Sequence, residues 1–118
     1  MGQPVVHFEI SSKDYKKAHD FYQNLFGWTI KEFGGMPYGL VDAEGDNSIG
    51  GGITETKDDT PPSVTFYIQV DDLQAYLDKA ESLGGKTVVP PSPIPNVGSF
   101  AMFSDIDGNV IGLFKSNE

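Results

Sequence analysis

Two titratable side chains, His7 and Glu9, lie two positions apart in the segment Val5–Ile10. The segment alternates between residue types, as a β-strand with two unlike faces does, so both side chains are expected on one face. A histidine titrates near neutral pH, and a carboxylate can orient it or exchange a proton with it. The pair could therefore transfer protons in a reaction. In the alternative interpretation, His7 is only hydrogen-bonded in a wet cleft.

The strand around His7 is repeated about 58 residues later, together with the helix that follows it. The matching pairs are Val6 and Val64, Phe8 and Phe66, Ile10 and Ile68, Asp14 and Asp72, Asp20 and Asp78, Leu25 and Leu83, Gly27 and Gly85, and Thr29 and Thr87. A repeat of half the chain indicates two copies of one supersecondary unit. The counterpart of the His7 face is then formed by Thr65, Tyr67 and Gln69.

The composition is that of a single globular domain covering residues 1–118. The chain contains no cysteine, which excludes disulfides and thiol chemistry. The formal net charge is −9, so neither a nucleic acid nor an anionic membrane is expected as a partner. No apolar run reaches transmembrane length and no signal peptide is evident, so a cytoplasmic location is expected.

Each half is expected to contain a strand, a helix and three more strands. In module one, about residues 4–56, the periodicity predicts a helix over 12–26 and later strands over 28–33, 36–43 and 48–55. Gly34-Gly35 is the expected hairpin turn, and three consecutive glycines weaken the strand 48–55.

Module two, about residues 63–116, follows a connector at about 57–62. The predicted elements are a strand over 63–70, a helix over 71–83 and strands over 86–89, 98–104 and 110–115. The prolines between positions 90 and 95 are expected to end the strand that begins at Lys86.

The order of these elements and three motifs resemble the vicinal oxygen chelate superfamily, which includes glyoxalase I, extradiol dioxygenases and bleomycin-resistance proteins. The motifs are Phe21-Tyr22…Leu25-Phe26-Gly27-Trp28, Val70-Asp71-Asp72 and the segment Asp105–Leu113. The resemblance covers almost every residue. It implies an α+β fold of two tandem βαβββ modules whose curled mixed sheets surround a cleft. Homodimers are common in the superfamily, so the resemblance also allows a homodimer.

The resemblance also implies positions for metal ligands, which in the metalloenzymes come from the first and last strands of each half. His7 matches the first position, whereas Thr65 and Gly112 replace ligands in module two. In the fourth strand, Gly50–Thr54 offers no carboxylate, and Glu55 would need a one-residue shift of register. Because a divalent ion takes at least three protein donors, no cofactor is predicted, and a divalent metal is the alternative.

Six residues are candidates for contacts with a ligand. Three of them, Thr65, Tyr67 and Gln69, should place polar groups on one strand face. The other three are aromatic and could supply flat apolar walls, although aromatic residues in strand proteins more often belong to the core. The candidates are Thr65, Tyr67, Gln69, Trp28, Tyr38 and Phe114.

Three functions are compatible with this sequence, because the superfamily's fold does not fix a reaction. The first is a glyoxalase/bleomycin-resistance-like protein that binds a small organic molecule without a metal. The second is a lyase or isomerase, similar to lactoylglutathione lyase, that uses His7 and Glu9 for proton transfer with or without a metal. The third is a non-catalytic module for assembly with, or regulation of, another protein.

Overall fold

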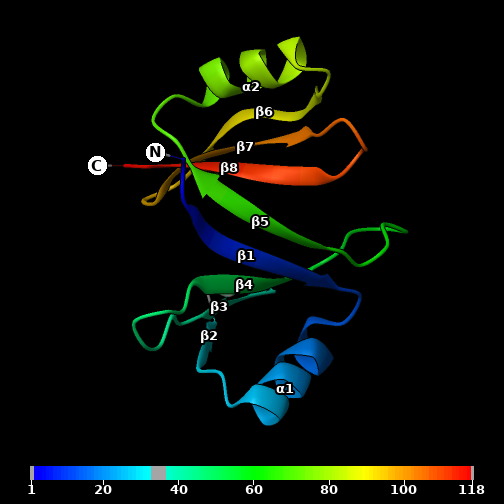
Figure 1. Ribbon diagram of the computed structural model, residues 1–118. Helices are drawn as coiled ribbons and strands as arrows, with labels where there is room; N and C mark the ends of the chain where they lie inside the picture. Colours follow the sequence, from blue (N-terminus) through cyan, green and yellow to red (C-terminus); the bar gives the residue numbers. More distant parts are fainter. Residues whose placement is uncertain (1, 33–36, 118) are drawn as a thin grey trace. The chain divides into compact units, whose positions relative to one another are not determined.

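The computed structural model describes residues 2–32 and 37–117 (Figure 1). Contacts divide the chain into two compact units. The first unit is His7–Val64, and the second unit is Thr65–Glu118 together with Met1–Val6. The hairpin turn predicted at Gly34-Gly35 lies outside the described residues.

The first unit contains the predicted order of strand, helix and three strands. The elements are β1 (Val5–Ser12), α1 (Tyr15–Phe26), β2 (Ile30–Glu32), β3 (Tyr38–Val41) and β4 (Gly50–Glu55). The strands lie in the order β2-β3-β4-β1, with β1 parallel to β4 and the other neighbours antiparallel. β4 pairs with both neighbouring strands despite its three glycines. The glycines leave space for aromatic rings on both faces of the strand. A Cβ at Gly51 would overlap the ring of Phe8.

The second unit repeats this topology. Its elements are β5 (Val64–Gln69), α2 (Leu73–Ser82), β6 (Lys86–Ile94), β7 (Gly98–Ser104) and β8 (Val110–Ser116). The strands lie in the order β5-β8-β7-β6, with β5 parallel to β8 and the other neighbours antiparallel. The predicted α+β fold of two βαβββ modules is therefore confirmed (Figure 1).

Strand β6 is longer than predicted. It was expected to end at Val89, yet it continues through the prolines to Ile94 and pairs with β7 along this length. β6 lies at the edge of the sheet, where a residue's outward side needs no N–H donor, so proline is tolerated there. The register shifts between Thr87 and Ser92 show how the strand accommodates these residues.

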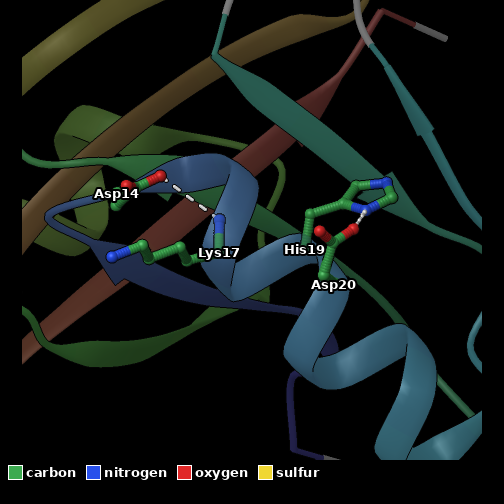
Figure 2. Close-up of polar contacts among 4 residues, drawn as sticks. All are labelled: Asp14, Lys17, His19 and Asp20. Carbon is green, nitrogen blue, oxygen red and sulfur yellow. Dashed lines mark hydrogen bonds and ion pairs between the residues drawn. The ribbon is translucent and has the colours of Figure 1, made fainter.

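Helix α1 begins later than predicted because an aspartate caps it. The carboxylate of Asp14 accepts a hydrogen bond from the backbone N–H of Lys17 at 3.2 Å (Figure 2). The carboxylate of Glu55, at the end of β4, accepts a hydrogen bond from the backbone N–H of Tyr15 at 3.1 Å, also at the start of α1. Asp72 caps α2 in the same way as Asp14 caps α1. The repeated aspartates therefore mark equivalent starts of the two helices.

Each helix covers one face of its own sheet with apolar side chains. In the first unit the buried residues are Tyr15, Val41 and Ile53, with Phe8, Ala18, Tyr22, Trp28 and Ile30 packed against them. In the second unit they are Val70, Leu73, Leu77, Ala101 and Leu113, with Ile68, Tyr76 and Phe103 packed against them. The helices have 12 and 10 residues, and none within the described ranges is long and apolar enough to cross a bilayer.

Candidate functional site

His7 and Glu9 lie on the face of the first unit's sheet that is opposite α1. His7 is paired with Gly50 and Glu9 with Gly52 on β4. Phe8, between them, points to the other face and packs in the cluster beneath α1. The alternation of β1 therefore places the two titratable side chains side by side on one face, as the sequence pattern predicted.

Tyr38, from β3, brings a hydroxyl group to both of these residues. Its phenolic oxygen lies 3.2 Å from Nε2 of His7. The hydroxyl also forms a hydrogen bond with Glu9. The ring lies over Gly52, where a Cβ atom would overlap the phenolic oxygen. The missing side chain at Gly52 thus allows Tyr38 to reach across β4, and we call His7, Glu9 and Tyr38 the polar triplet.

The surroundings keep the tyrosine and the histidine of this triplet uncharged at neutral pH. Burial raises the pKa of Tyr38 far above its ordinary value, and the negative charge and hydrogen bond of Glu9 raise it further. A phenol has one proton, and here it is directed to Glu9. In the tautomer that carries its proton on Nε2, His7 can therefore donate a hydrogen bond to the phenolic oxygen. Burial lowers the pKa of His7, so the imidazole is neutral at pH 7.

The triplet therefore offers one anionic acceptor, one phenol and one neutral imidazole. Such a group can accept hydrogen bonds from a ligand's N–H or O–H groups. A neutral imidazole can also take up a proton, which is the chemistry predicted for His7. The other histidine, His19, lies on α1, and its Nδ1 is 3.6 Å from a carboxylate oxygen of Asp20 (Figure 2).

In the second unit, β5 also has a polar face. Ile68 and Val70 pack beneath α2, so the alternating residues lie on the opposite face of the sheet. These residues are Thr65, Tyr67 and Gln69. Phe114 on β8 is paired with Gln69 on β5. The sequence-predicted ligand residues of this half therefore share one face of their unit.

Two of these side chains are engaged with β8. The hydroxyl of Thr65 donates a hydrogen bond to the carbonyl of Val110 at 2.7 Å. The ring of Tyr67 lies over Gly112, where a Cβ atom would overlap it. Thr65 therefore bonds to the main chain, and Tyr67 fills the space above a glycine.

Both units thus place a tyrosine ring over a glycine at equivalent strand positions. Gly52 is paired with Glu9, and Gly112 is paired with Tyr67. Glu9 and Tyr67 are counterparts in the repeat, so the two glycines are counterparts as well. The covering tyrosine comes from β3 in the first unit and from β5 in the second.

The residues present do not fit the metal centre of the superfamily's metalloenzymes. Gly112 and its counterpart Gly52 have no donor atom, and tyrosine rings occupy the space above them. Glu55 binds the backbone N–H of Tyr15 at the start of α1, so it is turned away from the His7 face. Within residues 2–32 and 37–117, no group of three or more His, Cys, Asp or Glu side chains could hold a metal ion.

Trp28 is not brought to His7, contrary to its predicted place in the wall of the site. Its ring packs with Tyr22, Phe26 and Phe8 at centroid distances of 5.5, 5.3 and 5.4 Å. It therefore belongs to the aromatic cluster on the α1 side of the sheet. Trp28 also precedes β2 rather than starting it, because β2 begins at Ile30.

The sequence-based interpretation missed the role of the Tyr38 hydroxyl and of Gly52. Tyr38 was expected to supply a flat apolar wall, whereas its oxygen bonds the two titratable residues. The available signal was the pairing of β3 with β4, which places Tyr38 opposite Thr54 and on the His7 face. That register depends on a hairpin whose length the sequence pattern did not fix.

The two βαβββ units give the chain an α+β architecture of glyoxalase-like type. The chain belongs to the Glyoxalase/Bleomycin resistance protein/Dioxygenase superfamily, whose sequence pattern matches residues 5–113. This confirms the resemblance drawn from the motifs.

Relatives and solved structures agree with this assignment. A glyoxylase-like domain-containing protein of Didymella fabae is 32% identical over 108 residues, covering 86% of this chain and 84% of that protein. CFP32 of Mycobacterium bovis, a candidate glyoxylase by its name, is 29% identical over 115 residues. That match covers 92% of this chain but only 44% of CFP32, so the chain spans less than half of that relative's length.

The fold is also that of methylmalonyl-CoA epimerase from Mycobacterium tuberculosis. The two structures superpose with a TM-score of 0.73, and the match covers 97% of this chain and 88% of the epimerase. The sequence identity is 17%, so this likeness concerns the fold alone.

Proposed function

We propose that this protein binds a small organic molecule through the polar triplet, without a metal ion. The observation that carries the proposal is the 3.2 Å contact between the Tyr38 oxygen and Nε2 of His7 beside Glu9. Three polar groups that converge on one sheet face can orient a ligand by hydrogen bonds. The poor fit of the residues to a metal centre supports binding by these side chains themselves.

The ligand should carry N–H or O–H donors. A positive charge on the ligand should strengthen its binding. Glu9 acts on Tyr38 as a negative charge, whereas Tyr38 keeps its proton and His7 is neutral at pH 7. The protein as a whole has a formal net charge of −9, which attracts cations to its surface. Amines and amides of moderate size are therefore the first compounds to test.

Thermal unfolding in the presence of candidate compounds tests this proposal. A ligand that binds only the folded state raises the melting temperature. The compound set should contain small organic amines. It should also contain bleomycin, the drug that appears in the superfamily's name. All samples should contain EDTA. A compound that binds the triplet should stabilise the wild type and His19→Ala but not His7→Ala. Equal stabilisation of His7→Ala would place the ligand elsewhere.

An isomerase or lyase activity is the second candidate function. The neutral state of His7 at pH 7 supports it, because a neutral imidazole beside a phenol can remove a proton from a carbon acid. Methylglyoxal mixed with glutathione, in D2O with and without Mn²⁺, is a direct probe. Product formation or deuterium uptake that is lost in His7→Ala would support catalysis. No turnover in either sample would count against a lactoylglutathione lyase-like activity and leave small-molecule binding as the leading function.

Cellular location and assembly belong to the same proposal. We expect a cytoplasmic protein whose partner is a small molecule, without a nucleic acid or a membrane as partner, because the acidic charge disfavours both. A homodimer is proposed from the superfamily resemblance, and light scattering of the purified protein tests it. If no compound binds, the third function, an assembly or regulatory module, becomes the leading one.

A further inference from the structure

A cavity lies beneath α2, on the face of the second unit's sheet that is opposite Tyr67. Its volume is about 470 Å³, and its walls are mainly apolar. Its apolar lining consists mainly of Ile68, Val70, Leu83, Phe103, Ile106 and Leu113. Small-molecule sites commonly have volumes of roughly 300–1,000 Å³ with largely apolar walls. The cavity is therefore large enough for a compact organic ligand.

Comparison of the two units explains why this space is open. Tyr22 in α1 and Ala80 in α2 are counterparts, since each follows its capping aspartate by the same number of residues. The Tyr22 ring packs against the core of the first unit and stacks on Trp28, with centroids 5.5 Å apart and an interplanar angle of 11°. Ala80 lines the cavity and has no ring. The second unit thus lacks a ring at the position of Tyr22. Its own tyrosine, Tyr76, also lines the cavity and is the counterpart of Ala18 in the first unit.

The edge of the cavity also exposes apolar surface that a ligand would cover. Leu83 is 69% exposed and Ile106 is 76% exposed, although both line the cavity. Covering such surface is favourable because it removes apolar area from water. Lys79 and Asp105 contribute one charge of each sign to the lining, so the cavity favours no net charge on its ligand.

We infer that this cavity binds a neutral, flat aromatic molecule about the size of indole, at the position that corresponds to Tyr22 in the first unit. The site is independent of the polar triplet, because its lining residues all belong to the second unit and share none with the triplet. It also lies beneath α2, on the face opposite Tyr67. Failure of one site therefore leaves the other proposal intact.

Titration of ¹⁵N-labelled protein with indole, followed by NMR, tests this inference. We expect saturable shifts of the backbone amides of Ala80, Leu83 and Leu113. Ala80→Tyr places the first unit's ring in the cavity and should weaken indole binding at least about tenfold, a loss that NMR titration resolves readily. Ala75→Tyr makes the same substitution on an exposed position of α2 and should retain wild-type affinity.

Two further measurements keep the test decisive. If Ala80→Tyr does not fold, Ala80→Leu fills part of the cavity and should give an intermediate loss of affinity. 1-Adamantanol, an aliphatic cage, should bind more weakly than indole, and equal binding would overturn the assignment to a flat aromatic ligand. No saturable shifts with indole, or equal losses in the Ala80 and Ala75 variants, would overturn the site.

Discussion

The phenolic oxygen of Tyr38 lies 3.2 Å from Nε2 of His7 although the two residues are on strands that do not pair with each other. β4 lies between these strands, and Gly52 on β4 has no side chain to block the tyrosine ring. A glycine therefore decides whether the imidazole, the phenol and Glu9 form one group. Four predictions follow from this arrangement and from the contacts around it.

Replacing Gly52 by Ala should displace Tyr38 and separate it from His7. The added Cβ would overlap the phenol, and such overpacking typically costs about 1–3 kcal/mol of unfolding free energy. Urea denaturation measures this cost. In the double variant Gly52→Ala/Tyr38→Ala the two effects should be less than additive, because the clash has been removed. Strict additivity would show that the ring does not occupy this space.

Replacing Tyr38 by Phe should change the stability at alkaline pH. The pKa of Tyr38 is raised in the folded state, so its ionisation favours unfolding once the pH exceeds the ordinary value of about 10. Wild-type protein should therefore lose unfolding free energy as the pH rises through 10, and Tyr38→Phe should lose less. The same variant should be less stable by about 1–2 kcal/mol at pH 7, because His7 and Glu9 lose a hydrogen-bonding partner. Parallel pH profiles for the two proteins would contradict the buried, Glu9-bonded phenol.

His7 should make the protein less stable as the pH falls from 7. Its pKa is lowered in the folded state, so below an ordinary pKa of about 6.5 the unfolded chain binds the extra proton first. Unfolding free energy measured between pH 7 and pH 5 should fall less steeply for His7→Gln than for the wild type. His19→Gln is the matched control and should keep the slope due to His7. A slope that is unchanged in His7→Gln would mean that the imidazole is not buried.

Glu55 should stabilise the start of α1 rather than serve a metal. Its carboxylate accepts the backbone N–H of Tyr15, an otherwise unpaired donor of the first helical turn. Glu55→Ala should reduce the unfolding free energy by about 0.5–2 kcal/mol, as the loss of a helix cap does. Glu55→Gln retains an acceptor oxygen and should lose less. If both variants retain wild-type stability, Glu55 is not a cap.

Alternation and the repeat were sufficient to predict much of this structure. The faces of His7, Glu9, Tyr67 and Gln69 follow from the period of a strand. The repeat also pairs Asp14 with Asp72, which cap the two helices, although the helices were expected to begin earlier, at positions 12 and 71. These features depend on local sequence patterns, so they can be predicted from a single sequence. The prediction that β6 ends before its prolines was wrong, because it depended on whether that strand is central or at an edge.

The contacts that define the site are not local, and the sequence did not predict them. Tyr38 reaches His7 only because of the register of β3 on β4 and the glycine at position 52. The direction of Glu55 likewise depends on the register of β4 on β1, in which Glu55 is paired with Ser12. Trp28 was assigned to the site from its residue type. Its ring instead packs against Tyr22, on the face of the first unit's sheet that α1 covers.

The most direct test of metal-free binding at the triplet is an NMR titration of EDTA-treated, ¹⁵N-labelled protein. The probes are the amines, or bleomycin, that raise its melting temperature. The proposal predicts saturable shifts centred on His7, Glu9, Tyr38 and Gly52 without added metal, and their loss in His7→Ala. Shifts confined to other residues, or shifts that appear only after addition of Mn²⁺ or Zn²⁺, would contradict it.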